Sequence, residues 1–509
     1  MNNWNKHSYR ALLLLSFLGI NALILFGISS VLSYLNTGAD RSSILHLEVG
    51  SEDAYLPKIS WSTAKNKGRP IEEPLIKEIE KDYLQAWYLR NAAFKNNDDY
   101  GLSNYFTDSI HTKIFNTIKF NKEQNTTINS TTLSHNPSID FYSADGKLVV
   151  FTDSEVISYE EVYSKDELVL QQKDTTTYQV IMLLEDGFWR IRQLVKLEAE
   201  NNQKSIKEKA LNIKGAIERI RGINYYPKEN PWAMFNDFFK ESIIDKDFKI
   251  IRKMGLNTVR IFVQYKGFGK SEVLVSKLAK LKTVLDIATK NELKIIVTLF
   301  DFYGNYDLMD WTLTQKHAEK IVSALKDHSA LLAWDLKNEP DLDFKGRGND
   351  KVLSWLKEHL SLIKSLDKKH PVTIGWSNPE AATLLVDKVD FISFHYYKEI
   401  ENFREAYKRL ASTVPYKAIL LQEYGYSSYG GIWNLYSGSE IKQEHYYKEV
   451  QALLKKEKIP FMFWTLYDFE EIPTNVAGSL PWKKEKQKYF GSIRTDGSHK
   501  RAFRYLNEQ

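Results

Sequence analysis

The 509-residue chain contains no cysteine. This absence excludes disulfides, cysteine-bound zinc and thiol catalysis, and it leaves the compartment open because a chain without thiols tolerates either redox state. An excess of one charge is also lacking, since 70 basic and 65 acidic residues give a net charge of +5 without a long basic run. Nucleic acid is therefore not indicated as a partner. The 43% of hydrophobic and 27% of charged residues are typical of a globular protein with two or three domains.

One long uncharged segment lies near the N-terminus, ALLLLSFLGINALILFGISSVLSYL at residues 11–35. About 20 apolar residues span a bilayer as a helix, and secretory signals have a shorter apolar core, so we expect an uncleaved transmembrane anchor in the lipid bilayer. A cleaved signal peptide is the alternative. Lys6 and Arg10 precede the segment and Arg41 follows it. The positive-inside rule then predicts a single-pass protein of the cell membrane, with residues 1–10 in the cytoplasm and the rest at the cell surface or in the periplasm.

The next region is predicted to be a linker at residues 36–70 followed by a small domain at residues 71–203. The linker is polar with scattered glycine and proline, whereas the domain begins with apolar residues at helical spacing and continues with a period of two. Helices followed by a bent antiparallel sheet resemble the NTF2-like cone fold, so we predict an α+β domain. No convergent acid–base set is visible, which favours a spacer or interaction module over a second active site. The predicted strands lie at residues 147–164, 167–187 and 188–200.

The C-terminal region, residues 210–509, alternates apolar strand-like runs with amphipathic helical stretches. Such alternation is typical of a parallel sheet that is covered on both faces. Eight units in about 300 residues predict an α/β fold of the (β/α)8 TIM-barrel type. A doubly wound open sheet is the alternative, but RGINYYPKENPW after the first strand has no glycine-rich phosphate loop. The predicted strands lie at residues 221–227, 257–263, 293–301, 331–340, 371–378, 390–398, 418–425 and 460–469.

Polar and aromatic residues interrupt these apolar strands near their C-terminal ends. The βα loops of a barrel gather at that end and form its active site. A polar residue in an apolar strand is costly unless it is paired or functional, so a whole set at one end favours a functional site. The set consists of Asn224, Arg260, Asp301, Asn338, Glu339, His395, Tyr397, Glu423 and Trp464.

Two carboxylic acids in this set match the needs of glycoside hydrolysis with retention, which uses two carboxyl groups about 5–5.5 Å apart. Glu339 ends the fourth strand and Glu423 ends the seventh, and these ends face each other across a barrel mouth. We predict Glu339 as the general acid/base, kept protonated by burial and by the charge of its neighbour, and Glu423 as the ionised nucleophile.

The remaining residues of the set are predicted to support this pair. Arg260 is the natural counter-charge of the nucleophile, and Tyr397 could donate a hydrogen bond to the same carboxylate. Asn338 is placed to bond the sugar 2-hydroxyl, a contact that strengthens in the transition state. His395 could orient the acid or bind a hydroxyl, and Trp464 offers a flat floor for the sugar. Among further aromatic residues of the loops, Trp311 and Trp376 are also predicted to stack on sugars.

Several of these segments resemble the clan A glycoside hydrolases, and most closely the cellulase type of family 5. They are NEP at 338–340, the HYY with His395 and Tyr397, the QEYG with Glu423, and FW at 463–464. The resemblance covers about residues 210–509 and implies retention of configuration, no cofactor or metal, and β-linked glucans or mannans as substrates. One position departs from the family, because Asp301 stands where a histidine is common, and this puts the subfamily and the sugar preference in doubt.

The sequence as a whole therefore predicts a membrane-anchored glycosidase that cleaves O-glycosidic bonds of a β-linked polysaccharide or oligosaccharide by double displacement. A transglycosidase that remodels an exported or cell-wall glycan would use the same residues. A non-catalytic glycan-binding scaffold is the third possibility, although a dead barrel would be expected to lose one of the two glutamates. The middle domain is a candidate contact for proteins of glycan synthesis or export.

Overall fold

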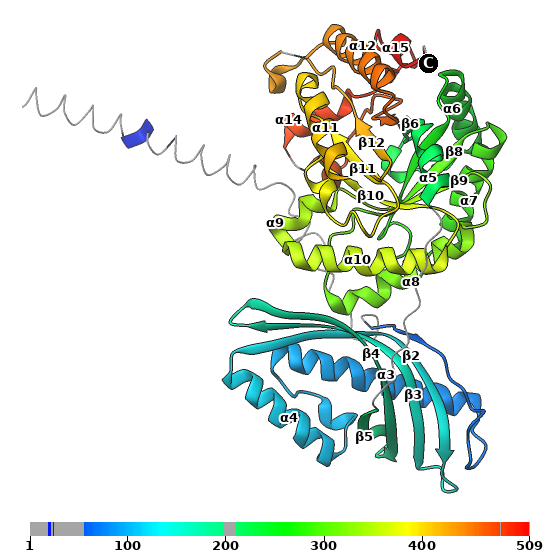
Figure 1. Ribbon diagram of the computed structural model, residues 1–509, viewed down its shortest axis with the longest axis vertical. Coiled ribbons are helices and arrows are strands. Elements are labelled where there is room, and N and C mark those ends of the chain that lie inside the picture. The colour runs from blue at the N-terminus through cyan, green and yellow to red at the C-terminus, as the bar shows by residue number, and fades with distance from the viewer. Residues whose placement is uncertain are drawn as a thin grey trace, which may run out of the picture.

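The computed structural model describes residues 19–21, 24, 55–197, 210–436, 438–478 and 480–507. An α+β domain is followed along the chain by a closed eight-stranded barrel, and the two lie one above the other (Figure 1). The transmembrane segment predicted at 11–35 lies almost wholly outside these residues. Within them, no helix combines the length and the apolar character needed to cross a membrane.

The α+β domain packs two helices against one face of a curved sheet (Figure 1). Helix α3 (Glu73–Asn96) has a proline in its first turn and ends at Asn97, whose left-handed backbone closes the helix. Helix α4 (Asp108–Glu123) follows it. The sheet has the order β1-β2-β3-β4-β5, antiparallel except for the pair β1–β2. Its strands are β1 (Lys58–Ile59), β2 (Thr126–Tyr142), β3 (Leu148–Ser164), β4 (Glu167–Glu185) and β5 (Phe188–Leu197).

The structure confirms an α+β region here and corrects two details of the prediction. Residues 126–142 form a full strand, which was not predicted because its buried residues mix polar side chains such as Thr131 and His135 with apolar ones such as Leu133 and Ile139, without a clear apolar alternation. The end of the predicted linker 36–70 is part of the fold, since β1 pairs with β2 and Tyr55 lies in the hydrophobic core. The likeness to the NTF2-like cone stays a prediction.

The barrel confirms the predicted (β/α)8 architecture. All its strands are parallel and run in the closed order β10-β11-β12-β13-β6-β7-β8-β9. Helix α5 (Ala210–Glu218) brings Ile217 into an apolar cluster with residues from the starts of the strands, at the end of the barrel opposite the carboxylates. The strands are β6 (Arg221–Asn224), β7 (Thr258–Gln264), β8 (Lys294–Asp301), β9 (Leu331–Asn338), β10 (Val372–Trp376), β11 (Ile392–Tyr396), β12 (Ile419–Tyr424) and β13 (Phe461–Phe463).

The outer helices bury one apolar stripe each against the strands. In α6 (Glu241–Lys253), for example, Ile244, Phe248 and Ile251 recur at helical spacing and are buried. The other long helices are α7 (Val275–Lys290), α8 (Trp311–Leu325), α10 (Asn349–Leu366), α11 (Phe403–Thr413) and α12 (Glu440–Glu457), and the short ones are α9 (Phe344–Arg347), α13 (Thr474–Ala477), α14 (Pro481–Lys488) and α15 (Phe503–Asn507).

The α+β domain contacts the barrel through α8 and α10, which face it in Figure 1. The rings of Tyr159 and Trp311 lie 4.7 Å apart at this interface. Gln171 Nε2 donates to Ser354 Oγ over 2.6 Å, and Lys173 forms an ion pair with Glu358 at 2.7 Å. The loop between β8 and α8 also takes part, since Lys95 Nζ donates to Asp307 Oδ2 over 2.8 Å, so the interface extends to a loop at the carboxyl end of the barrel strands.

Candidate active site

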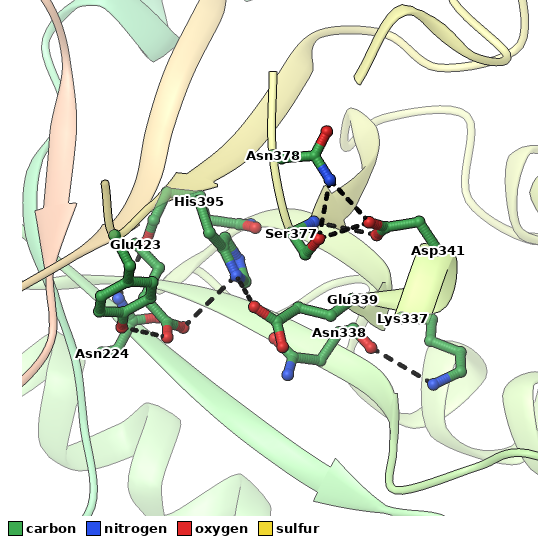
Figure 2. Close-up of polar contacts among 12 residues, drawn as sticks. Asn224, Lys337, Asn338, Glu339, Asp341, Ser377, Asn378, His395 and Glu423 are labelled. Atoms are coloured by element: carbon green, nitrogen blue, oxygen red, sulfur yellow. Dashed lines mark hydrogen bonds and ion pairs between the residues drawn. The ribbon is translucent and has the colours of Figure 1, made fainter. Parts of the chain in front are cut away.

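The two predicted catalytic glutamates converge at the C-terminal end of the barrel strands. Glu339 directly follows β9 and Glu423 lies in β12. His395 of β11 lies between them, with Nδ1 2.8 Å from Glu339 Oε1 and 4.0 Å from Glu423 Oε2 (Figure 2). One polar atom from each of these three side chains lies within 4.8 Å of the other two. The Glu339 and Glu423 side chains are 20% and 13% exposed, so both reach solvent from a largely enclosed position.

The position of Glu339 is fixed by backbone contacts to neighbouring strands. Its backbone has a positive φ of 47°, which is uncommon for a residue with a side chain. Its N–H donates to the Gly375 carbonyl of β10 over 2.7 Å. Just beyond it, the Asp341 carboxylate accepts hydrogen bonds from the Ser377 N–H at 3.0 Å and the Asn378 side chain at 3.0 Å (Figure 2). The loop after β9 is therefore tied to the loop after β10.

Arg260 of β7 is fully buried beneath the two glutamates. Its Nη1 donates to Glu423 Oε2 over 3.2 Å, and its Nη2 donates to Asn338 Oδ1 over 2.9 Å. The predicted counter-charge of the nucleophile is thus in contact with it. The guanidinium thus places a buried positive charge directly beside the Glu423 carboxylate.

Asp335 of β9, which was not among the predicted site residues, holds Arg260 in place. Asp335 Oδ2 accepts from Arg260 Nε at 2.9 Å, from Arg260 Nη2 at 2.5 Å and from the Thr298 hydroxyl at 2.8 Å, and Oδ1 accepts from the Gly375 N–H at 2.9 Å. A Cβ at Gly375 would approach Gln422 Oε1 to 2.5 Å and Arg260 Nη2 to 2.8 Å, so glycine leaves the room that the guanidinium needs. The signal available in the sequence was an acidic residue inside an apolar strand, LLAWDLKN.

Tyr397 and His395 each contact one glutamate as predicted. The Tyr397 hydroxyl donates to Glu423 Oε1 over 2.5 Å, and burial together with this negative charge raises the pKa of Tyr397 well above its usual value. The hydroxyl therefore keeps its proton. Burial opposes a charged imidazole at His395, but the Glu423 charge and the hydrogen bond to Glu339 outweigh it and raise the pKa of His395. A protonated imidazole beside both carboxylates becomes more favourable than in water.

Asn338 and Asn224 complete the polar floor of the site. Asn338 accepts from Arg260 through its side-chain oxygen, which orients its amide N–H groups away from the guanidinium. Asn224 Oδ1 accepts from Arg260 Nη1 at 3.1 Å, and its Nδ2 donates to the Gln422 carbonyl at 2.9 Å. Asn224 thus links β6, β7 and β12 at the level of Glu423.

Asp301 and Trp464 lie on the two sides of Tyr226. The Tyr226 hydroxyl donates to Asp301 Oδ2 over 3.2 Å, and its ring meets the Trp464 ring edge-on at 6.1 Å between centroids. Trp464 directly follows β13 and its buried Nε1 has no hydrogen-bond partner among the described residues. The structure therefore places both residues at the carboxylate end of the barrel, and their sugar contacts stay predictions.

Two of the predicted stacking residues do not offer a free ring. Trp311 begins α8, is completely buried against Tyr159 of the α+β domain, and donates from Nε1 to the Tyr306 carbonyl over 3.1 Å. Its prediction as a sugar-binding residue is wrong, because its ring packs an interface between domains. Trp376 at the end of β10 is 1% exposed and lies near the Phe344 ring, so it too lacks a face for a sugar. The position of an aromatic residue after a strand does not reveal whether other parts of the protein will cover its ring.

Glu339, His395 and Glu423 are close enough together to be compared with a metal site. Their hydrogen bonds argue against that use. Both oxygens of Glu423 accept from strong donors, Arg260 and Tyr397, and His395 Nδ1 is engaged by Glu339. A fixed guanidinium at 3.2 Å from Glu423 would also repel a bound cation. The donor set suits acid–base and nucleophilic chemistry better than metal binding.

The comparison with known families agrees with this geometry. Residues 215–470, half of the 509-residue chain, match the family model described as cellulase (glycosyl hydrolase family 5). The chain belongs to this family and is a glycosidase that acts on O-glycosyl compounds.

Curated relatives are similar to the barrel part of the chain. A mannan endo-1,4-β-mannosidase A of Emericella nidulans is 26% identical over 40% of this chain and 67% of its own length. A mannan endo-1,4-β-mannosidase F of Aspergillus clavatus is 28% identical over 32% of this chain and 44% of its own. A mannan endo-1,4-β-mannosidase 5 of Solanum lycopersicum is 35% identical over 20% of this chain and 28% of its own. The chain thus spans two thirds or less of each of these relatives.

Solved structures with a similar arrangement include an exo-β-1,4-mannosidase from Opitutaceae bacterium strain TAV5, at 18% identity and a TM-score of 0.44 over 56% of this chain and 58% of that one. A GH5 protein from Streptomyces cattleya, solved with GlcNAc, has 15% identity and a TM-score of 0.44 over 56% of this chain and 78% of that one.

Proposed function

We propose that this protein is a retaining β-glycoside hydrolase in which Glu423 is the nucleophile and Glu339 the general acid/base. The observation that carries the proposal is the convergence of the two glutamates, with an oxygen of each within 4.8 Å of the other. Retaining enzymes need a short separation because one carboxylate attacks the anomeric carbon directly, whereas inverting enzymes leave room for a water molecule at about 6.5–9.5 Å.

The contacts of the two glutamates support a division of roles. Arg260 and Tyr397 both donate to Glu423, which stabilises a carboxylate anion and aims it at the sugar. Glu339 contacts His395, which can exchange a proton. In the first step Glu423 would bond to the anomeric carbon while Glu339 gives its proton to the departing oxygen. In the second step Glu339 would take a proton from water, which then displaces Glu423.

The substrate we propose is a β-linked mannan or glucan. The supporting observation is that the first relatives are named as mannan endo-1,4-β-mannosidases. Asn338 uses its side-chain oxygen to accept from Arg260 Nη2 over 2.9 Å. Its amide N–H groups therefore remain available to the sugar 2-hydroxyl. Mannose and glucose differ in the orientation of that hydroxyl, so the Asn338 contact is where the two sugars would be distinguished.

The place of action we propose is the outer face of a membrane. The uncharged segment at residues 11–35 and the basic residues before it support an anchored protein with the barrel outside the cytoplasm. A transglycosidase that passes the sugar to another glycan would use the same residues. Elongated oligosaccharides among the products would favour it over hydrolysis.

A substrate screen with a matched variant tests the proposal. Wild type and Glu423→Gln would be assayed on β-mannans and β-glucans, with reducing ends and chain lengths as the readout. We expect wild-type turnover on at least one of them and a loss of about three or more orders of magnitude in the variant, because nucleophile and charge are both removed. Near-normal turnover by Glu423→Gln would show that the nucleophile is assigned wrongly.

A further inference from the structure

A cluster of exposed apolar side chains lies in the loop that follows the strand of the nucleophile. Ile432, Trp433, Leu435 and Tyr436 are 59%, 50%, 88% and 71% exposed. Elsewhere among the described residues, large exposed apolar side chains occur singly or as sequence pairs. Scattered apolar residues are ordinary on a protein surface, whereas a contiguous group marks an interaction site. We call these four residues the apolar loop.

The apolar loop is held in shape by its own backbone. Residues Ile432–Asn434 form a short 3-10 helix, and the Asn434 side chain donates to the Tyr429 carbonyl over 2.9 Å. Leu435 and Tyr436 both have positive φ values, 47° and 55°, which bulky side chains rarely adopt. Both side chains are exposed to solvent despite this unfavourable backbone conformation. An unfavourable conformation at an exposed apolar site is a reason to look for a binding role.

A basic helix lies against the apolar loop. The rings of Trp433 and Trp482 are 6.0 Å apart, and Trp482 is the second residue of α14 (Pro481–Lys488). This helix has the sequence PWKKEKQK, with four lysines and one glutamate. The glutamate, Glu485, is paired with Lys488 at 2.7 Å. Lys483 and Lys486 are exposed.

This combination of groups matches one kind of partner. Branched aliphatic side chains such as Leu435 have no flat face for a sugar ring, and a neutral mannan or glucan would gain nothing from lysines. Apolar side chains that enter the acyl boundary, Trp and Tyr at headgroup depth, and lysines facing lipid phosphates together define an interfacial membrane contact. We propose that the apolar loop and α14 form a docking surface for an anionic phospholipid bilayer, in addition to the N-terminal segment predicted as an anchor.

The consequence is an orientation of the barrel. The apolar loop extends from the same end of β12 that carries Glu423. A bilayer bound there would lie beside the mouth of the active site, so the enzyme would work on glycan close to the membrane surface. The docking surface itself uses none of the residues assigned to catalysis, and its failure would leave the proposed reaction intact.

The absence of native cysteine allows a site-specific test in the full chain. Leu435→Cys would carry an environment-sensitive nitrobenzoxadiazole label, and Tyr416→Cys would be the matched control, since Tyr416 is 94% exposed on the segment between α11 and β12, before the strand begins. Both proteins would be mixed with vesicles of phosphatidylcholine, with or without phosphatidylglycerol. Because both share the same N-terminal segment, a difference between the labels reports this surface alone.

We expect a blue shift and quenching by lipid-borne doxyl groups at position 435 with phosphatidylglycerol, and no change at position 416. Adding Lys483→Glu and Lys486→Glu should weaken the response about tenfold or more. Equal signals at the two positions would overturn the proposal. A response at position 435 that depends neither on phosphatidylglycerol nor on the two lysines would overturn it as well. So would a label that responds to soluble β-mannan and not to vesicles, which would assign the surface to glycan. Hydrolysis of a soluble aryl glycoside should remain unchanged in every variant.

Discussion

The two domains of this protein each contain a histidine–carboxylate contact, and the two contacts differ in access. At the barrel mouth His395 lies 2.8 Å from Glu339, which reaches solvent. In the α+β domain His135 Nδ1 lies 2.6 Å from Asp153 Oδ2, and both side chains are completely buried. The residue types and the distances are nearly the same. The two contacts differ in whether a substrate could reach them, since only the contact in the barrel is open to solvent.

The buried set has the composition of a nucleophile–base–acid relay. Thr132 Oγ1 lies 2.7 Å from His135 Nε2, and Tyr83 donates to Asp153 Oδ2 over 2.7 Å. Tyr55 closes the set on the remaining side through a short contact with Thr132. Every polar atom named here has a partner, and no side chain exceeds 5% exposure. A fully satisfied and sealed network stabilises a core and cannot receive a substrate. The barrel contact also pairs a histidine with a carboxylate, but there the carboxylate reaches solvent.

The largest difference between the two sets should appear on removal of the negative charge of Glu423, the proposed nucleophile. Glu423→Gln should lower kcat/KM by about three or more orders of magnitude, because Arg260 and Tyr397 then surround a neutral amide. Initial rates on an aryl β-mannoside would measure it. Thr132→Val, the matched change in the α+β domain, should leave kcat/KM of the folded protein within about twofold, and an equal loss in both would erase the distinction.

A second prediction concerns the buried support of Arg260. Asp335→Asn should lower kcat by about two orders of magnitude and destabilise the fold by about 3–5 kcal/mol, since it leaves a buried guanidinium without its charged partner. Thermal unfolding and kinetics of the same preparation would separate the two effects. Thr298→Val, which removes one hydrogen bond from the same carboxylate, should fold and lose about tenfold in kcat. Full activity in both variants would show that Arg260 needs no such support.

A third prediction uses the raised pKa of His395. Because the folded protein binds this proton more tightly than the unfolded chain, the contact stabilises the fold fully below the ordinary pKa of about 6.5 and loses that contribution as pH rises through the folded value. The Tm advantage of wild type over His395→Gln should therefore be largest near pH 5.5 and smaller at pH 9. An advantage that grows with pH would contradict the assignment.

The smallest effect on activity is expected in the sealed network of the α+β domain. His135→Gln should cost about 1–3 kcal/mol of stability, because Asp153 and Thr132 lose a buried partner. Its kcat/KM per folded molecule should equal that of wild type. Denaturant unfolding gives the first quantity and active-site-normalised kinetics the second. A kinetic loss without a stability loss would indicate that the network has a functional role after all.

Much of the barrel could be predicted because its signals are local and repeated. Apolar strands with polar residues at one end gave all eight strands and brought Glu339, Glu423, Arg260 and His395 together. Asp335 was passed over, since a lone acid in an apolar strand does not reveal its partner. Trp311 was assigned wrongly because its ring is covered by a different domain, and contacts between domains leave no local pattern. Strand β2 was missed because buried polar side chains such as Thr132 and His135 interrupt its apolar pattern, and their hydrogen-bond partner Asp153 cannot be read from the sequence.

The most direct measurement of the central claim is azide rescue of Glu339→Ala on a β-mannoside with a good leaving group. Such a substrate needs little protonation, so Glu423 should still form the covalent sugar ester, and azide should then release it from the side that Glu339 normally serves. The result expected is a glycosyl azide of β configuration with restored turnover. An α-configured azide would show a single displacement and contradict the roles given to the two glutamates.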